Sequence, residues 1–143
     1  MQSVFTPLAM ASAAIAVSAV FVNFVIVAMR MPHLPDKVPC HFGISGKPDA
    51  WSGKWVVWVL PGLSLLFVLV IGGALALENM GRAESARRDT EMMSGMTACV
   101  AMMSLIITFR TFSVAEKRAQ GLGWWAAPLF LMAMILAALG YSL

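Results

Sequence analysis

The residues best suited to chemistry gather in one polar segment, residues 30–54. His33, Asp36, Cys40, His41 and Asp49 lie there, and imidazole, thiolate and carboxylate groups are all ligands of zinc. Their spacing matches no recognised zinc pattern, and the adjacent residues Cys40 and His41 would point to opposite sides of an extended chain. A metal site at Asp36, His41 and Asp49 is therefore only a secondary interpretation. We favour a structural loop, in which the aspartates cap turns and His41 bonds to the backbone, and expect no cofactor or metal.

No catalytic arrangement is evident elsewhere. The serines are scattered, the chain has only two histidines, and it contains no H-E-x-x-H pattern or paired intramembrane carboxylates. Cys40 lies in the polar segment and Cys99 in an apolar one, so we expect no disulfide between them. We therefore expect a non-enzymatic protein.

The polar segment itself has the composition of an ordered cap. Its prolines (Pro32, Pro35 and Pro39) each fix φ and remove a backbone donor, which predicts an extended first half. Its glycines (Gly43, Gly46 and Gly53), with Pro48-Asp49, predict turns in the second half. We expect a turn-rich cap at a membrane surface.

The rest of the chain indicates an all-α integral membrane protein. Of its 143 residues, 60% are hydrophobic and only 12% are charged, too few to cover a water-exposed surface. Four long apolar segments predict transmembrane helices over 7–29, 55–77, 92–113 and 124–141, since about 20 apolar residues cross a bilayer. The first lacks a basic leader and exceeds the usual signal-peptide core, so we expect it to be retained. The prediction is a single membrane domain, 1–143, folded as a four-helix bundle.

Antiparallel helices would place loops 30–54 and 114–123 on one membrane face and loop 78–91 on the other. Seven of the ten basic residues fall on the first face: Arg30, Lys37, Lys47, Lys54, Arg110, Lys117 and Arg118. All the tryptophans also belong there: Trp51, Trp55, Trp58, Trp124 and Trp125. Basic loops favour the cytoplasm and tryptophans favour the headgroup layer. We therefore expect loops 30–54 and 114–123 to be cytoplasmic.

A few polar residues interrupt the predicted helices. Asn23 lies within the first, and Thr97, Ser104 and Thr108 lie within the third. Such residues can mark a transport path, but they more often bond neighbouring helices together. Arg110 lies near the end of the third helix, where its side chain can reach the headgroups. Pro61 predicts a kink near the start of the second helix.

One pattern in the polar segment resembles a known family. Leu34-Pro35-Asp36, Val38-Pro39 and His41-Phe42 are followed by Gly46, Asp49 and Trp51, which reads L-P-D-x-[I/V]-P-x-H-[F/W] and then G-x-x-D-x-[W/Y]. This pattern, placed after a first transmembrane helix, resembles the small domain of unknown function of SdpI-like bacterial membrane proteins. The namesake group includes a toxin-immunity protein that also acts in signalling. The resemblance implies a multi-pass protein of the bacterial cytoplasmic membrane and a motif of these residues: Pro35, Asp36, Pro39, His41, Gly46, Asp49 and Trp51.

Together these features predict a protein that binds a protein or peptide partner at the membrane through the cap. Its small net charge of +3 gives no indication of nucleic-acid binding. The first alternative is a structural subunit of a larger membrane complex, which uses Ala- and Met-rich surfaces to fill gaps between bigger subunits. A third is a small transporter, for which only Asn23 and the third helix offer polar residues.

Overall fold

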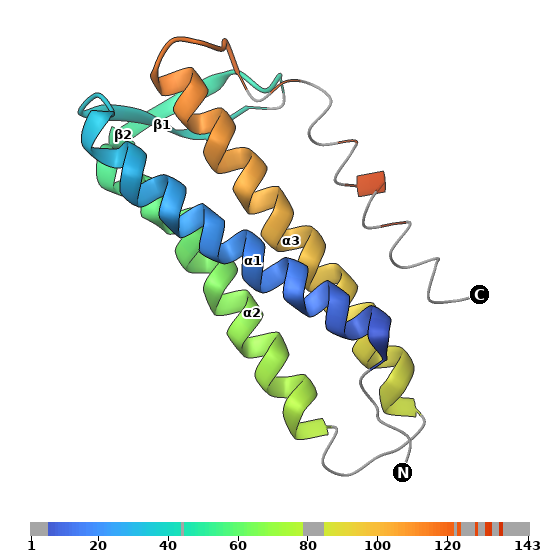
Figure 1. Ribbon diagram of the computed structural model, residues 1–143. Helices are drawn as coiled ribbons and strands as arrows, with labels where there is room; N and C mark the ends of the chain where they lie inside the picture. Colours follow the sequence, from blue (N-terminus) through green and yellow to red (C-terminus); the bar gives the residue numbers. More distant parts are fainter. Residues whose placement is uncertain are drawn as a thin grey trace.

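Three long helices form the body of the protein (Figure 1). The computed structural model describes residues 6–43, 45–78, 85–121 and 123, together with residues 128, 131, 132 and 135. Within them, α1 spans Pro7–Arg30, α2 spans Val59–Glu78 and α3 spans Ser85–Ala115. All three contain segments long and apolar enough to cross a membrane. The protein is thus mostly helical and multi-pass, as its composition predicted.

The helix ends differ from the expected ones in two places. The third helix begins at Ser85, before the predicted start at residue 92. Its first turns are polar and precede the apolar span. Pro61 is the third residue of α2. A 3-10 helix, η2 (Lys54–Trp58), precedes it, so the helix type changes next to the expected kink. The predicted helix 124–141 falls almost wholly outside the described residues.

The polar segment folds into a β-hairpin, which the all-α prediction did not include. A short 3-10 helix, η1 (Met31–His33), follows α1, and β1 (Lys37–Phe42) then pairs with β2 (Pro48–Gly53) in an antiparallel sheet. Register shifts on either side of His41 mark one extra residue in each strand, Cys40 in β1 and Asp49 in β2. The hairpin lies across one end of the helices, at the end where α1 and α3 finish and α2 begins (Figure 1). Strand pairing satisfies the backbone groups that an irregular loop would leave open.

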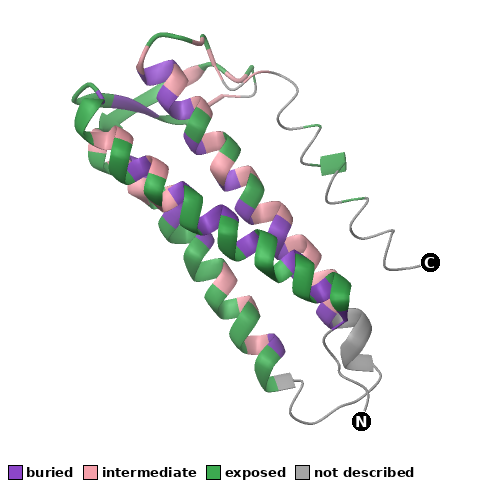
Figure 2. Ribbon diagram, viewed as in Figure 1, coloured by how far each residue is buried: buried purple, intermediate pink, exposed green. Residues whose placement is uncertain are grey.

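The seam between α1 and α3 is built from small side chains. Along α3, a row of buried residues recurs at alternating intervals of three and four. Each of them is hydroxylated or an alanine: Thr90, Ser94, Thr97, Ala101, Ser104, Thr108, Thr111 and Ala115. The facing row on α1 is similar: Ala9, Ser12, Ala16, Ala19, Asn23 and Val27. Such residues let two helix backbones approach closely in a membrane, where hydrophobic burial no longer drives association. The large apolar side chains of α1 and α2 point outward instead (Figure 2).

A chain of hydrogen bonds crosses this seam and joins all three helices. Asn23 of α1, fully buried, donates from Nδ2 to Ser104 Oγ of α3 at 3.0 Å. Ser104 Oγ in turn donates to the Leu60 carbonyl of α2 at 3.2 Å. The structure thus places Asn23 as a link between helices, the commoner of the two interpretations of a polar residue in a span.

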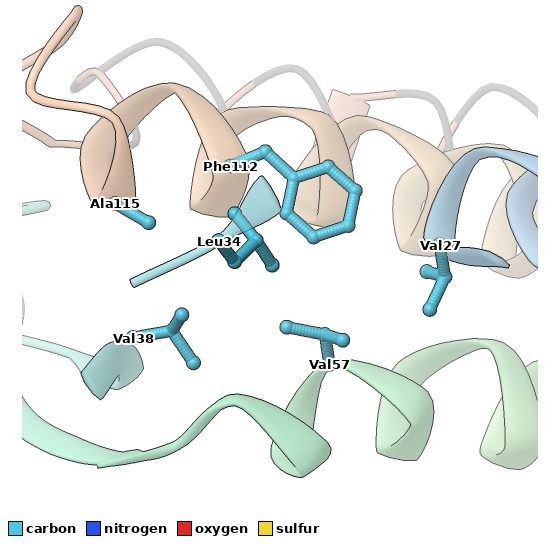
Figure 3. Close-up of a cluster of buried hydrophobic side chains, with 6 residues drawn as sticks. All are labelled: Val27, Leu34, Val38, Val57, Phe112 and Ala115. Carbon is cyan, nitrogen blue, oxygen red and sulfur yellow. The ribbon is translucent and has the colours of Figure 1, made fainter. Parts of the chain in front are cut away.

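An apolar cluster joins the hairpin to the helix ends (Figure 3). Its residues come from α1, β1, η2 and α3 and from the segment between η1 and β1: Val27, Leu34, Val38, Val57, Phe112 and Ala115. Val38 of β1 and Phe112 of α3 are both fully buried. The hairpin is therefore packed on the bundle and does not hang from it as a flexible loop.

The seam leads to a stability prediction. We expect Ala16→Leu to destabilise the fold by about 1–3 kcal/mol, because a larger side chain at the α1–α3 contact forces the backbones apart. Ala13→Leu, at an exposed position on the same helix, should have little effect. Unfolding of the purified protein in mixed detergent micelles measures both. Equal stability of the two variants would contradict this account of the seam.

Candidate functional site

The most distinctive polar contact of the hairpin is a cross-strand pair between His41 and Asp49. Nδ1 of His41 lies 2.6 Å from Asp49 Oδ1, and the two side chains are 69% and 53% exposed. Because a carboxylate oxygen accepts, His41 Nδ1 is the donor in this contact. Asp49 is the extra residue of β2 at this point of the ladder, which lets it contact His41 although the register partner of His41 is Ala50. Gly43 makes room for the carboxylate, since a Cβ there would lie 3.2 Å from Asp49 Oδ2.

Asp36 lies at the opposite end of the hairpin. Its carbonyl accepts a hydrogen bond from the Lys54 backbone N–H at 3.1 Å, which extends the ribbon by one pair beyond β1 and β2. Its fully exposed carboxylate lies 3.9 Å from the Lys54 ammonium. Asp36 is therefore separated from His41 and Asp49 by the length of the strand. Among the described residues, no three His, Cys, Asp or Glu side chains come close enough to hold a metal ion. The structure thus brings together two members of the candidate metal set, and not the third.

The remaining motif residues shape or border the hairpin. Pro39 is buried and pairs in register with Trp51, whose side chain is 51% exposed. Gly46 lies in the turn with a φ of +73°, a conformation that favours glycine. Pro35 is exposed, just before β1. Trp51 and the still more exposed Trp55 place aromatic rings at the hairpin end of the bundle.

The segment after α3 holds the turn of the hairpin in place. A Cβ on Gly121 would collide with the Gly46 carbonyl oxygen, so the two backbones are in direct contact. Glu116 accepts from Arg30 at 3.2 Å and lies 3.0 Å from Arg118, which ties the end of α3 to the end of α1. Arg30 also lies over the Phe109 ring, 5.7 Å from its centre. Segments 30–54 and 114–123 thus meet at one end of the bundle, the pairing of loops that an antiparallel arrangement requires.

Sequence analysis missed the contact of Gly121 with the hairpin and the link that Glu116 makes between the ends of α1 and α3. Their contacts join residues that are far apart in the chain, so no local spacing reveals them. The only available signal was the pair of glycines at 121 and 123 in a short polar loop, and a glycine in such a loop is usually explained by a turn.

Two further features lie inside the helical region. Arg110 lies half-buried on α3, one turn before the end of that helix. A groove of about 610 Å³ between α2 and α3 is walled almost entirely by apolar side chains, among them Leu63, Phe67 and Met103. Such a groove suits an acyl chain or an apolar side chain. The hairpin is therefore the candidate functional site.

Residues 19–65 match a sequence family. Its description is a domain of unknown function (DUF1648), and the match runs from the second half of α1 through the hairpin into α2. No curated protein and no solved structure matches the chain. The matched region is the one that contains the hairpin, which supports membership of a small, uncharacterised, membrane-associated family.

The contact between Gly46 and Gly121 can be tested directly. We expect Gly121→Ala to loosen the hairpin and lower stability by more than about 1 kcal/mol, because the added methyl must displace backbone. Faster hydrogen exchange at the Gly43 amide, which donates to Lys47 across the turn, would report the loosening. Gly53→Ala is the matched control, since a Cβ there meets nothing within 4 Å. Unchanged exchange in Gly121→Ala would refute the bracing role of this loop.

Proposed function

We propose that this protein is a non-enzymatic, SdpI-like membrane protein that binds a protein or peptide partner through its hairpin, in an immunity or signalling role. The observation that carries the proposal is the His41–Asp49 pair: two polar groups, hydrogen-bonded to each other and open to solvent, on a hairpin that the bundle holds rigid. A preoriented polar pair next to an exposed tryptophan suits recognition, because little side-chain freedom is lost on binding.

Stability alone does not account for the pair. Exposed ion pairs typically contribute less than about 1 kcal/mol, whereas the buried cluster around Val38 and the contact with Gly121 hold the hairpin. His41 bonds to Asp49 and, within the described part of the chain, to no serine or cysteine, which supports binding over nucleophilic catalysis.

The membrane setting belongs to the same proposal. We place the protein in the bacterial cytoplasmic membrane as a four-helix bundle, with residues 124–141 as the fourth helix and the hairpin on the cytoplasmic side. The excess of basic residues at the hairpin end supports this orientation. The resemblance of the Leu34–Trp51 pattern to SdpI-like proteins supports the bacterial assignment.

A structural subunit of a larger complex is the second candidate. The apolar groove between α2 and α3 favours it, because a neighbouring subunit can fill such a groove. Recovery of the protein only as a monomer from mild detergent would argue against it. Transport is the third candidate and would require a polar path along the α1–α3 seam beside Asn23; substrate flux into proteoliposomes would test it.

The hairpin's role in binding can be tested by site-specific cross-linking. We expect a photoreactive amino acid at position 47, in the exposed turn, to capture a protein other than this chain in intact membranes. His41→Ala and Asp49→Ala should each lower that yield about tenfold, since a lost hydrogen bond to a charged group costs about 1.5 kcal/mol or more.

The controls separate binding from folding. Both alanine variants should unfold within about 1 kcal/mol of the parent protein, because the pair is exposed. Ser45→Ala, in the same exposed turn, should leave the yield unchanged, and a photoreactive residue at the lipid-facing Met29 should capture no such partner. Full capture in both alanine variants would eliminate the proposal.

Orientation has its own measurement. Cys40 is exposed on the hairpin, whereas Cys99 is half-buried within α3. We expect a membrane-impermeant maleimide to label Cys40 in inside-out vesicles and not in intact cells, with Cys40→Ser as the background control. Labelling from the outside of intact cells would reverse the assigned orientation.

A further inference from the structure

Within the part of the chain that the structure describes, the outer edge of β2 has unpaired backbone groups. The Lys54 N–H donates to Asp36, so the backbone of Lys54 faces β1. Because the backbone groups of successive strand residues alternate in direction, Ser52 also faces β1, whereas Trp51 and Gly53 face away from it. Every residue of β2 is exposed or half-buried, and a Cβ on Gly53 would meet nothing within 4 Å. The outward N–H and C=O groups of Trp51 and Gly53 therefore face open space.

The two edges of the sheet differ in the residues that face outward. On β1, the register partners of Gly53 and Trp51 are Lys37 and Pro39, so these two face the outer edge of β1. A lysine and a proline are the residues that natural proteins use to prevent strand addition, and Pro39 has no N–H to offer. At the matching positions of β2 stand a tryptophan and a glycine, which do not prevent it. Pro48 and the bulge at Asp49 limit pairing at the start of β2, so the part of its edge that remains able to pair is residues 51–53.

Among the described residues, the element that follows β2 also has a surface without a partner. Only 17% of the apolar window of Lys54–Leu77 is buried, against 33% in each of the other two spans. Its glycines, Gly62, Gly72 and Gly73, would each accept a Cβ into empty space. A glycine without a neighbour leaves a shallow surface at which another helix can approach closely. The open strand edge thus continues directly into an open helix surface.

We propose that both surfaces are covered by a second copy of this chain, in a two-fold dimer. All copies in one membrane share the direction of the membrane normal, and the hairpin lies across the end of the helices (Figure 1). A two-fold axis along the normal therefore brings two β2 edges together in antiparallel orientation. Trp51 and Gly53 then exchange hydrogen bonds with the partner subunit's Gly53 and the partner subunit's Trp51, and Ser52 lies opposite Ser52 of the partner subunit. The two hairpins become one four-stranded sheet, more stable than a two-stranded ribbon.

This dimer does not depend on the proposed partner binding, because it uses the backbone edge of β2 and the surface of α2. The His41 and Asp49 side chains remain free for another molecule. Failure of one proposal therefore leaves the other to be judged on its own measurements.

Disulfide trapping tests the dimer in the full-length protein in its own membrane. In a Cys40→Ser, Cys99→Ser background, Ser52→Cys should form a disulfide-linked dimer on mild oxidation, since facing residues of a non-hydrogen-bonded pair have Cβ atoms about 5 Å apart. Lys37→Cys, exposed on the protected edge, should not. Gly53→Pro should then lower the yield about tenfold, because it removes an outward N–H from each copy.

The proline variant is compatible with the folded hairpin. Gly53 has a φ of −63°, the value that proline prefers, and its N–H is not used to pair with β1. Gly53→Ala keeps the N–H and should retain the full yield, while Gly73→Leu should lower it by blocking close approach at α2. Absence of a Ser52→Cys dimer, or a yield unaffected by both Gly53→Pro and Gly73→Leu, overturns the proposal and assigns these surfaces to residues 124–141, to another protein or to lipid.

Discussion

The hydrogen bonds from Asn23 to Ser104 and from Ser104 to the Leu60 carbonyl set the relative positions of the three helices. Each such bond contributes less than about 1 kcal/mol in a membrane on average. These bonds fix the register of the helices. A helix shifted by one turn would leave the buried amide without a partner, in a region that holds no water. The small residues of the seam allow this contact, since bulkier side chains would hold α1 and α3 too far apart for Asn23 to reach Ser104.

The hairpin depends on that register. Val27 lies about one turn beyond Asn23 on α1, and Phe112 about two turns beyond Ser104 on α3, so the seam determines where both meet Val38 and Val57. The same helix ends bring Arg30 to Glu116. The chain after α3 then passes close enough for Gly121 to touch Gly46. A hairpin of this size is marginal alone in water, and here its order comes from the bundle beneath it.

Within the hairpin, the side chains that pack on the bundle differ from those that face outward. Val38 and Pro39 of β1 are buried, whereas β2 and the His41–Asp49 pair face outward. The buried residues account for the position of the sheet, and the exposed ones add little to it. Exposed polar and aromatic groups on a fixed support are the usual components of a recognition surface. Both proposals for this protein draw on that division, one on outward side chains and the other on an outward backbone edge.

Composition and hydrophobic length predicted three of the helices, because each backbone group in a bilayer must be satisfied within its own helix and this requirement is local. Proline and glycine in residues 30–54 likewise indicated an ordered cap, and the motif named His41 and Asp49. The strands were missed, since prolines, glycines and a bulge obscure the alternation by which a strand is recognised. Only the tertiary structure decided that His41 bonds to Asp49, that Gly121 touches Gly46 and that one strand edge stays open. Each of these depends on a pairing between separate segments, which no local pattern encodes.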